Sequence, residues 1–394
     1  VRNCQQRSAL LTEILENSSG TDIPAPSSEI ASEHTDEMAA IFYTSGSTGE
    51  AKGVMLSHRN LVSNTQATVE YLRLTSDDSV MVILPFYYIY GNSLMLTHIA
   101  AGGTLVIDNR FMYPEVVLDN MESSGVTGFS GVPSHFMILL NSTTMVKRKF
   151  ATLRYFTQAG GGMAPEVITK LADSFPQKEI WIMYGQTEAS PRVTYLPPER
   201  LKEKLGSIGI PVPGVTVEIV NEKGEPMPAG EVGELTVIGD NVMLGYLNQP
   251  EETRSVLHHG RLWTGDLARR DEEGYIYITG RRREIIKTGG NRVSAREIEE
   301  CLLKHPKVAE AAVFGYPDDL LGEAVLAEVV FKQAECETVD EIRSFCGRNL
   351  SVHKVPKLIK IREQLPKLAT GKIDKVALRA EFSIETKQTD RSGK

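Results

Sequence analysis

Residues 44–53 have the composition of a loop that wraps a polyphosphate. The segment reads Thr-Ser-Gly-Ser-Thr-Gly-Glu-Ala-Lys-Gly, so three glycines, four hydroxyls and one lysine fall within ten positions. Glycine permits positive φ and close backbone approach, successive N–H groups form an anion-binding nest, and Lys52 adds a point charge. A flexible Ser/Gly linker is the alternative. A Walker A loop is excluded, because Gly-x4-Gly-Lys-Ser/Thr cannot be aligned here.

The flanking sequence indicates where this loop lies. The apolar run at residues 39–43 is typical of a buried strand, and the stretch from Arg59 onward has a helical pattern. We therefore expect the loop at the end of a strand, where open α/β sheets bind their ligands.

Four further segments contain residues that could act on a nucleotide. Tyr-Gly-Gln-Thr-Glu at 184–188 follows the apolar run 180–183. The others are Trp-Thr-Gly-Asp at 263–266 (ahead of the strand-like run 275–281), Ile-Lys-Thr-Gly-Gly-Asn at 286–291, and Leu-Pro-Lys-Leu-Ala-Thr-Gly-Lys-Ile-Asp-Lys at 365–375. In this order the five segments resemble the adenylate-forming superfamily of acyl-CoA synthetases, luciferases and peptide-synthetase adenylation domains. The resemblance extends from about residue 38 to about residue 380.

The resemblance implies a reaction in two steps. The carboxylate of an acid attacks the α-phosphorus of ATP, pyrophosphate leaves, and the acyl-AMP then reacts with the thiol of CoA. Nucleotidyl transfer depends mainly on positioning and charge neutralisation, which donors and cations supply. ATP, Mg²⁺ and CoA are the implied cofactors, and a small carboxylic acid is the implied substrate. An acyl-AMP ligase that loads an acyl carrier protein is one alternative, and a nucleotide-binding fragment without full activity is another.

The same resemblance gives roles to individual residues. The loop is expected to hold the β- and γ-phosphates, Thr187 to contact the α-phosphate, and Glu188 to ligate Mg²⁺. Tyr184 is expected to stack on adenine, and Asp266 to accept from both ribose hydroxyls. The expected nucleotide-binding residues are Thr44, Ser45, Gly46, Ser47, Thr48, Gly49, Lys52, Gly160, Gly161, Gly162, Tyr184, Gly185, Gln186, Thr187, Asp266, Ile278, Arg281 and Lys372. The expected catalytic residues are Lys372, Thr187, Glu188 and Lys52.

Several of these positions have a structural alternative. Thr187 and Glu188 also fit a helix start with an acidic first turn, and Asp266 fits a Gly-Asp turn. The triplet 160–162 is otherwise a strand-to-helix turn, and Arg281 is otherwise a solvated charge.

The C-terminal segments are expected to serve one half-reaction each. By resemblance, Lys372 bridges the incoming carboxylate and the α-phosphate, which suits a compact, mobile ammonium; an exposed lysine is the alternative. In the thiol step Gly289 and Gly290 would line the entry tunnel and Arg283 would act as the hinge. A simple turn explains the two glycines equally well. Leu368 stands where acyl-CoA synthetases often have threonine, which leaves the subfamily open.

The segment Pro-Phe-Tyr-Tyr-Ile-Tyr-Gly at 85–91 matches one wall of the acyl pocket. The expected substrate residues are Tyr88, Gly91 and Gly185. Relatives that activate amino acids place an aspartate in this segment; here no acid is present, so an α-amino acid is disfavoured. Acyl-CoA synthetases commonly have histidine at the position of Tyr88, which is a departure. An apolar, aromatic wall favours a fatty or aryl acid.

The predicted fold class is α/β. Strand-like runs at 80–84, 104–107, 153–156 and 180–183, separated by helical patterns at 114–123 and 164–174, predict a doubly wound, mainly parallel sheet. Antiparallel strands at 215–220 and 233–238 predict a small β-barrel-like subdomain within 214–280. A small mobile α+β domain is expected after it, with a capping box at Ser294, helices at 297–304 and 339–348 and strands at 308–314 and 324–331.

These patterns also predict the domain organisation. Residues 1–37 are expected to be a linker or the end of a missing N-terminal part, and 38–282 a large nucleotide- and acyl-binding domain. Residue 283 is the expected hinge, 284–382 the small C-terminal domain, and 383–394 a disordered tail, because that tail has few apolar residues.

Composition narrows the class of protein further. The chain has 394 residues, 41% hydrophobic and 24% charged, with a net charge of −8, which argues against a nucleic-acid partner. Its four cysteines lack metal-binding spacing, and free thiols fit a reducing, cytoplasmic location. No apolar run is long enough for a transmembrane segment, and no signal peptide is visible.

Overall fold

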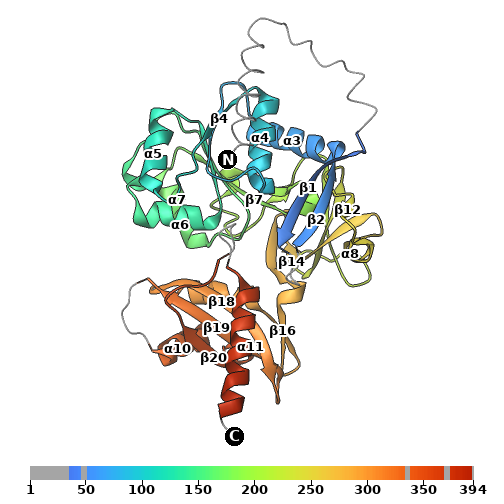
Figure 1. Ribbon diagram of the computed structural model, residues 1–394, viewed down its shortest axis with the longest axis vertical. Coiled ribbons are helices and arrows are strands. Elements are labelled where there is room, and N and C mark those ends of the chain that lie inside the picture. Colours follow the sequence, from blue (N-terminus) through green and yellow to red (C-terminus); the bar gives the residue numbers. More distant parts are fainter. Residues whose placement is uncertain (1–34, 46–50, 333–337, 368–372, 393–394) are drawn as a thin grey trace, which may run out of the picture. The chain divides into compact units, whose positions relative to one another are not determined.

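The described residues form four β-sheets, and the largest has seven strands. Figure 1 shows how the labelled strands and helices are arranged. The computed structural model describes residues 35–45, 51–332, 338–367 and 373–392; for Ser45 and residues 385–392 it describes the backbone alone. The predicted mixed α/β fold class is confirmed. Met38–Lys394 form a single compact unit, so the predicted division at residue 283 stays a prediction.

The seven-stranded sheet has the order β4-β3-β5-β6-β7-β8-β9. Its strands are β3 (Ser79–Val82), β4 (Thr104–Ile107), β5 (Gly128–Gly131), β6 (Tyr155–Gln158), β7 (Glu179–Gly185), β8 (Arg192–Leu196) and β9 (Ile210–Pro211). The pairings among β3 to β7 are parallel, and those of β8 with β7 and β9 are antiparallel. The direction of the strands therefore changes between β7 and β8.

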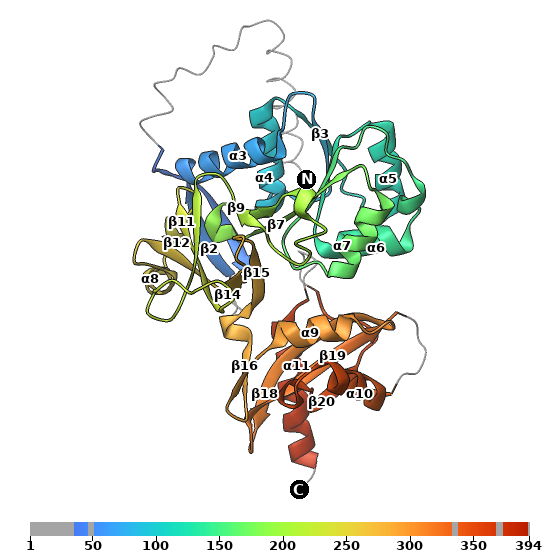
Figure 2. The same cartoon turned by 180° about the vertical axis from the view of Figure 1, so that it is seen from behind.

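Helices cover both faces of this sheet. They are α3 (His58–Leu72), α4 (Ile89–Ala101), α5 (Pro114–Ser123), α6 (Pro133–Ser142) and α7 (Pro165–Ser174). Figure 1 and Figure 2 show α3 and α4 on one side of the strands and α5, α6 and α7 on the other. Strand residues such as Met81 and Phe156 are therefore wholly buried, which explains the continuous apolar runs in place of alternation. Of the helices in the described ranges, none has the length and apolarity to cross a membrane.

The glycine-rich loop lies in a hairpin. Strand β1 (Met38–Ser45) pairs antiparallel with β2 (Ala51–Ser57), and β12 (Gly245–Tyr246) completes a three-stranded sheet. Strand β1 ends at Ser45, so the expected strand directly before the loop is confirmed, as is the helix from about Arg59, which is α3 (His58–Leu72). The expected place in the open α/β sheet is wrong, because β1 belongs to this three-stranded sheet and not to the seven-stranded one. The prediction that the apolar run at 39–43 is a buried strand is also wrong, because Phe42 is its only fully buried residue. Residues 46–50 themselves are outside the described residues.

A five-stranded antiparallel sheet follows. Its strands are β10 (Val215–Val220), β11 (Gly233–Gly239), β13 (Leu257–His258), β14 (Arg261–Arg270) and β15 (Ile276–Arg281), with α8 (Pro250–Val256) before β13. The predicted pair at 215–220 and 233–238 is confirmed as β10 and β11. Strand β14 pairs with β15 so that Asp266 stands opposite Arg281. This register brings a carboxylate and a guanidinium to one edge of the sheet.

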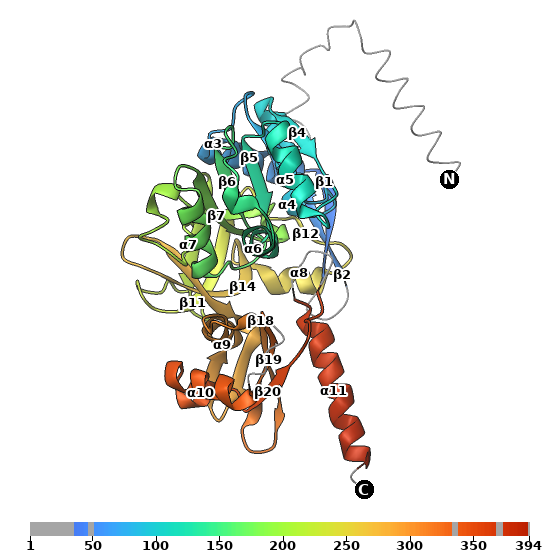
Figure 3. The ribbon, with the colours of Figure 1, turned by 90° about the vertical axis from the view of Figure 1, so that its left-hand side faces the viewer.

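The fourth sheet is sandwiched between helices (Figure 3). It contains β16 (Ile285–Thr288), β17 (Asn291–Ser294), β18 (Val308–Asp318), β19 (Gly322–Phe331) and β20 (Leu358–Ile361), with helices α9 (Ala295–Leu303), α10 (Val339–Asn349) and α11 (Lys375–Ser392). Ala311 and Val313 of β18 pack in the core with α9 and α10, whereas Ala312 and Phe314 pack with Phe382 of α11. Because successive side chains of a strand point to opposite faces, Ala311 and Val313 lie on one face of the sheet and Ala312 and Phe314 on the other.

Short 3₁₀ turns complete the backbone. They are η1 (Met145–Lys147), η2 (Thr187–Ala189), η3 (Pro198–Arg200), η4 (Arg282–Glu284) and η5 (Val352–Lys354).

Two predictions about the C-terminal part are wrong. No capping box forms at Ser294: its hydroxyl accepts no hydrogen bond from the N–H groups of α9, and it donates to the carbonyl of Thr279 at 2.8 Å. The tail is not disordered from residue 383, since α11 continues to Ser392. Leu378 and Phe382 anchor the first turns of α11 in a core, and this anchoring outweighs the polar composition of the later turns of the helix.

A side-chain clamp fixes the first residue after the sheet reversal. Asn64 of α3 is buried, and its amide donates to the carbonyl of Arg192 at 2.8 Å. The amide oxygen of Asn64 accepts from the Arg192 N–H at 3.1 Å. Asn241 donates to the same carbonyl at 3.1 Å. The backbone of Arg192 is therefore saturated and held to α3.

We predict that Asn64→Ala lowers the free energy of unfolding by about 1–3 kcal/mol, because it leaves a buried N–H without a partner. Urea denaturation measures this loss. The control is Asn141→Ala at an exposed position of α6, which should stay within about 0.5 kcal/mol of the wild type. Equal effects of the two substitutions would contradict the clamp.

Candidate active site

Three of the predicted residues meet at a buried carboxylate. Asp266 is 3% exposed. The hydroxyl of Tyr184, near the end of β7, donates to its Oδ2 at 2.7 Å, and Nε of Arg281 donates to its Oδ1 at 2.7 Å. Burial raises the pKa of Tyr184 well above its ordinary value, and the charge of Asp266 adds to this. The phenol therefore stays protonated and remains a donor.

The turn before Asp266 sets the direction of its carboxylate. Gly265 has φ of +75°, which favours glycine. Thr264 donates from its hydroxyl to the carbonyl of Leu235 at 2.7 Å and accepts from the Asp266 N–H at 3.1 Å. Buried Glu234 accepts from the Gly265 N–H at 3.1 Å and from Arg282 at 3.0 Å. Sequence reasoning missed Glu234, which a strand pattern gives no reason to single out.

The segment at 185–188 turns sharply after β7. A Cβ on Gly185 would lie 1.7 Å from the carbonyl oxygen of Pro191, so this position has to be glycine. The N–H of Gln186 donates to that same carbonyl at 3.0 Å, and the side-chain Nε2 of Gln186 is buried without a hydrogen-bond partner. Thr187 and Glu188 lie in η2. The fold thus leaves an unused amide donor beside the two residues predicted to handle phosphate and metal.

Tyr246 contacts both Glu188 and Lys52. The hydroxyl of Tyr246 donates to Oε1 of Glu188 at 2.8 Å, and Nζ of Lys52 lies 5.0 Å from the centre of the Tyr246 ring. Burial, followed by the charge of Glu188, raises the pKa of Tyr246, so this phenol also stays neutral.

Lys52 is not a free cation. It is 8% exposed and donates to Oε2 of Glu252 at 2.5 Å. This hydrogen bond lowers the pKa of Glu252. Tyr246 and Glu252 are about two hundred positions from Lys52 in the sequence, and no spacing rule links such residues, so the sequence analysis missed both.

Tyr88 and Gly160 lie against one another. A Cβ on Gly160, which has φ of +84°, would come within 2.7 Å of the Tyr88 hydroxyl. Gly91 has a different reason to be glycine, because a Cβ there would lie 2.3 Å from the carbonyl oxygen of Pro85. Gly91 is buried inside α4 and does not line the cavity that Tyr88 and Gly160 share. Its predicted contact with substrate is therefore not supported by its position.

One cavity connects most of these residues. The predicted residues that line it are Thr44, Lys52, Tyr88, Gly160, Gly185, Gln186, Thr187, Glu188, Arg281 and Arg283. Ile89, Tyr90, Trp263 and Thr264 also line it; they belong to segments that the sequence analysis quoted without giving these residues a role. Lining residues outside those segments include Ala159, Pro191, Arg192, Glu234 and Tyr246. Tyr184 and Asp266 lie behind the lining residues Thr264 and Arg281.

The structure also gives a place to the other predicted residues that it describes. Gly161 and Gly162 are exposed, and the Gly161 carbonyl accepts from Gln158 at 2.8 Å. Ile278 of β15 packs against the core of the antiparallel sheet. Gly289 and Gly290 form the exposed turn between β16 and β17 with φ of +54° and +80°. Arg283 lies in η4. Gly46, Ser47, Thr48, Gly49 and Lys372 lie outside the described residues, as does the side chain of Ser45.

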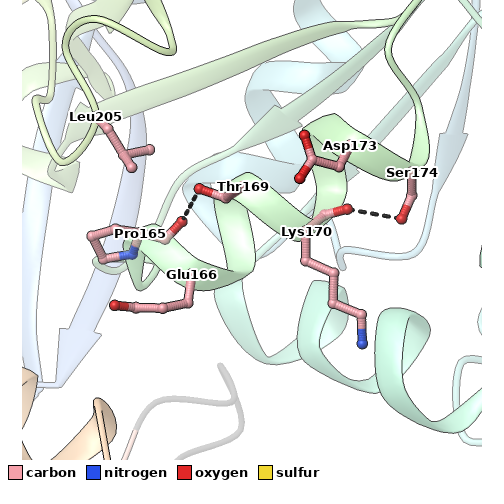
Figure 4. Close-up of a pocket in the computed structure, with 7 residues that line it drawn as sticks. All are labelled: Pro165, Glu166, Thr169, Lys170, Asp173, Ser174 and Leu205. Atoms are coloured by element: carbon pink, nitrogen blue, oxygen red, sulfur yellow. Dashed lines mark hydrogen bonds between the residues drawn. The ribbon is translucent and has the colours of Figure 1, made fainter.

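A second pocket lies along α7 and contains none of the predicted residues (Figure 4). The hydroxyl of Thr169 donates to the carbonyl of Pro165 at 2.9 Å, and that of Ser174 to the carbonyl of Lys170 at 2.8 Å. Both hydroxyls thus satisfy backbone groups of their own helix, so this pocket offers little chemistry.

The described residues offer no group of three or more His, Cys, Asp or Glu side chains that could hold a metal ion. Glu188 is a single carboxylate with one oxygen bonded to Tyr246. One carboxylate fits a magnesium ion that keeps waters and takes its other ligands from substrate phosphates. It does not fit a metal held by protein side chains alone.

Comparison with known proteins identifies the family. Residues 3–247 match the AMP-binding enzyme family, and residues 297–372 match the AMP-binding enzyme C-terminal domain. The chain belongs to the AMP-binding enzyme family. This confirms the resemblance to adenylate-forming enzymes.

Relatives within this family are named for different substrates. A long-chain-fatty-acid–CoA ligase of Yersinia pestis is 39% identical over 351 residues, which is 88% of this chain and 62% of the relative. An oxalate–CoA ligase of Arabidopsis thaliana is 34% identical, covering 87% of this chain and 67% of the relative. This chain thus spans less than two thirds of the length of the Yersinia relative.

A solved structure within the family has a matching fold. The o-succinylbenzoate–CoA synthetase MenE from Bacillus subtilis, in complex with ATP and magnesium ion, is 31% identical with a TM-score of 0.78. The match covers 86% of this chain and 69% of that one.

We predict that Asp266→Asn lowers the free energy of unfolding by about 1–3 kcal/mol, because an amide cannot offset the charge of Arg281 and replaces an acceptor with a donor. Thermal and urea unfolding at neutral pH check this. The exposed Asp240→Asn serves as the matched control and should change stability by less than about 0.5 kcal/mol. If Asp266→Asn were equally neutral, the carboxylate would not organise the site.

Proposed function

We propose that this protein activates a carboxylic acid with ATP to give acyl-AMP and pyrophosphate, and then transfers the acyl group to the thiol of CoA. The observation that carries the proposal is the buried Asp266 carboxylate, held by Tyr184 and Arg281 beside the cavity that Thr187 and Glu188 line. Membership of the AMP-binding enzyme family supports it. The names of the relatives, CoA ligases for fatty acids and for oxalate, support the reaction type and leave the acid open.

The nucleotide would be held by groups at two ends of the cavity. Each Asp266 oxygen accepts one hydrogen bond in the structure and has a further lone pair for a ribose hydroxyl. Tyr184 would supply the face for adenine, with Gly160, Gly161 and Gly162 opposite. Gly185, Gln186, Ile278 and Arg281 would complete the nucleotide contacts. The unused Nε2 of Gln186 is a donor that a ligand oxygen would satisfy.

The phosphates would lie toward Thr187, Lys52 and the loop at 44–49. Lys52 is already paired with Glu252, so phosphate has to compete with that carboxylate or draw Lys52 away from it. Glu188 would ligate Mg²⁺, whose charge helps to neutralise the phosphates. The Tyr246 hydroxyl holds Oε1 of Glu188 and thereby orients the other oxygen.

The second half-reaction would use the C-terminal residues. In this proposal 38–282 form the large domain, Arg283 is the hinge, and 284–382 form the small domain. Gly289 and Gly290 would line the path of the thiol, since a turn without side chains does not obstruct a pantetheine arm. An acyl carrier protein in place of CoA would be revealed by thioester formation with that protein alone. Buried free thiols at Cys301 and Cys346 support a reducing, cytoplasmic location.

The direct test is acid-dependent exchange of labelled pyrophosphate into ATP, run over a panel of fatty, aryl and short acids. The proposal expects exchange that requires both an acid and Mg²⁺. Nucleotide binding without exchange for any acid would contradict the proposed activity and favour the alternative of a nucleotide-binding protein.

We predict that Glu188→Gln raises the Mg²⁺ concentration needed for half-maximal ATP binding by at least about tenfold, because an amide oxygen carries no charge to offset a dication. Calorimetric titration of ATP at several Mg²⁺ concentrations measures the shift. Binding of AMP without metal is the internal control and should be unchanged. An unchanged Mg²⁺ requirement would remove Glu188 from the metal site.

We predict that Lys372→Ala abolishes acyl-AMP formation while thioester formation from supplied acyl-AMP stays within a few fold of wild type. The lysine is proposed to neutralise charge in the first transition state only, where one preorganised contact is worth roughly 3–4 kcal/mol. Pyrophosphate exchange and thiolysis of acyl-AMP are assayed separately. Equal loss in both assays would show that Lys372 is not specific to the first step.

A further inference from the structure

Arg192 is a buried arginine in the wall of the cavity. It is the first residue of β8, 2% exposed, and stands opposite Gly185 in the strand register. The cavity lining around it includes Tyr88, Tyr90 and Pro191. Because Asn64 and Asn241 hold its backbone, the side chain has a fixed origin.

The guanidinium of Arg192 has no carboxylate partner among the described residues. Within the described part of the chain it forms no ion pair or hydrogen bond, and its Nε is buried without a partner. Its contact is the face of the Tyr90 ring, 4.2 Å from the ring centre. Two other shielded arginines are paired: Arg148 with three carboxylates and Arg362 with Glu328 and Glu381. A buried charge is costly unless it is paired, so Arg192 lacks a partner that it needs.

The neighbouring tyrosines do not supply the missing charge. Burial raises the pKa of both Tyr88 and Tyr90, although the guanidinium acts in the opposite direction. Both phenols therefore stay neutral at physiological pH. The hydroxyl of Tyr90 donates to the carbonyl of Thr157 at 3.0 Å, so Tyr90 offers Arg192 only its ring face. Such a stacked arrangement orients a guanidinium and leaves its N–H groups for a ligand.

We propose that the acid carries a second carboxylate, which Arg192 binds at the end of the acyl pocket away from the reacting carboxylate. This inference rests on the proposed function and names the substrate class of the same site: a dicarboxylic acid. Arg192 is suited to this role because a planar guanidinium pairs with a carboxylate through two parallel hydrogen bonds. In the sequence analysis the aromatic wall that includes Tyr88 and Tyr90 favoured a fatty or aryl acid. In this proposal the same wall positions the cation and excludes water.

The first test compares substrates on the wild-type enzyme. Straight-chain dicarboxylic acids of increasing length are compared with their methyl half-esters, which keep one reactive carboxylate and the same chain. We expect kcat/KM for pyrophosphate exchange to be roughly tenfold to a hundredfold higher for a diacid than for its half-ester at the optimal length. Equal values at every length, or a preference for long monocarboxylic acids, would overturn the proposal.

The second test removes the cation. Arg192→Leu should abolish the preference for the diacid and raise its calorimetric Kd at least tenfold, and Arg192→Lys should have an intermediate effect. The matched control is Arg269→Leu, because Arg269 also lies over a tyrosine ring, 4.6 Å from the centre of Tyr277, but does not line the cavity. That control should keep both the preference and the Kd. A preference that persists in folded Arg192→Leu would overturn the proposal.

The two readouts separate this inference from the proposed function. Diacid binding that depends on Arg192, without exchange for any acid, would mean that the anion site is real and the adenylation activity is not. Exchange with monocarboxylic acids and no effect of Arg192 on binding would mean the reverse. If Arg192→Leu does not fold, the diacid and half-ester comparison on the wild type decides alone.

Discussion

The site depends on one buried carboxylate. Asp266 receives hydrogen bonds from Tyr184 of the main sheet and from Arg281 of the antiparallel sheet, so a single side chain ties two sheets together. Burying a charge is costly unless it has such partners. The positive φ of Gly265, the Thr264 hydroxyl and the backing carboxylate of Glu234 all serve to hold it. The cavity lies next to this junction, between elements far apart in the sequence.

The sequence predicted well where local composition decides structure. The strand runs ahead of residue 184, the helix with Pro165 in its first turn, and the antiparallel pair β10 and β11 were all predicted correctly. The sequence-based predictions failed where contacts between distant segments decide the structure. The run at 39–43 looks like a core strand but forms an edge hairpin, and Ser294 has a capping sequence but bonds to Thr279 instead.

The candidate site shows the same division. Three residues of the family-like segments, Tyr184, Glu188 and Asp266, lie in or beside one cavity, and their roles stay predictions. The sequence analysis missed Tyr246, Glu252 and Arg192, because each is recognised only by a contact with a residue distant in the sequence. Tyr246 contacts Glu188, Glu252 contacts Lys52, and Arg192 contacts Tyr90. A lone arginine in a strand pattern is usually a solvated charge, and only its burial without a counter-ion shows otherwise.

The central claim is that the acid is activated as a mixed anhydride with AMP. The most direct measurement uses an acid labelled with heavy oxygen in its carboxylate, followed by mass spectrometry of the nucleotide after reaction with CoA. Because a carboxylate oxygen attacks the α-phosphorus and stays on it when the thiol displaces AMP, the account predicts one heavy oxygen in AMP and none in pyrophosphate. Heavy oxygen in inorganic phosphate together with ADP as the product would contradict it.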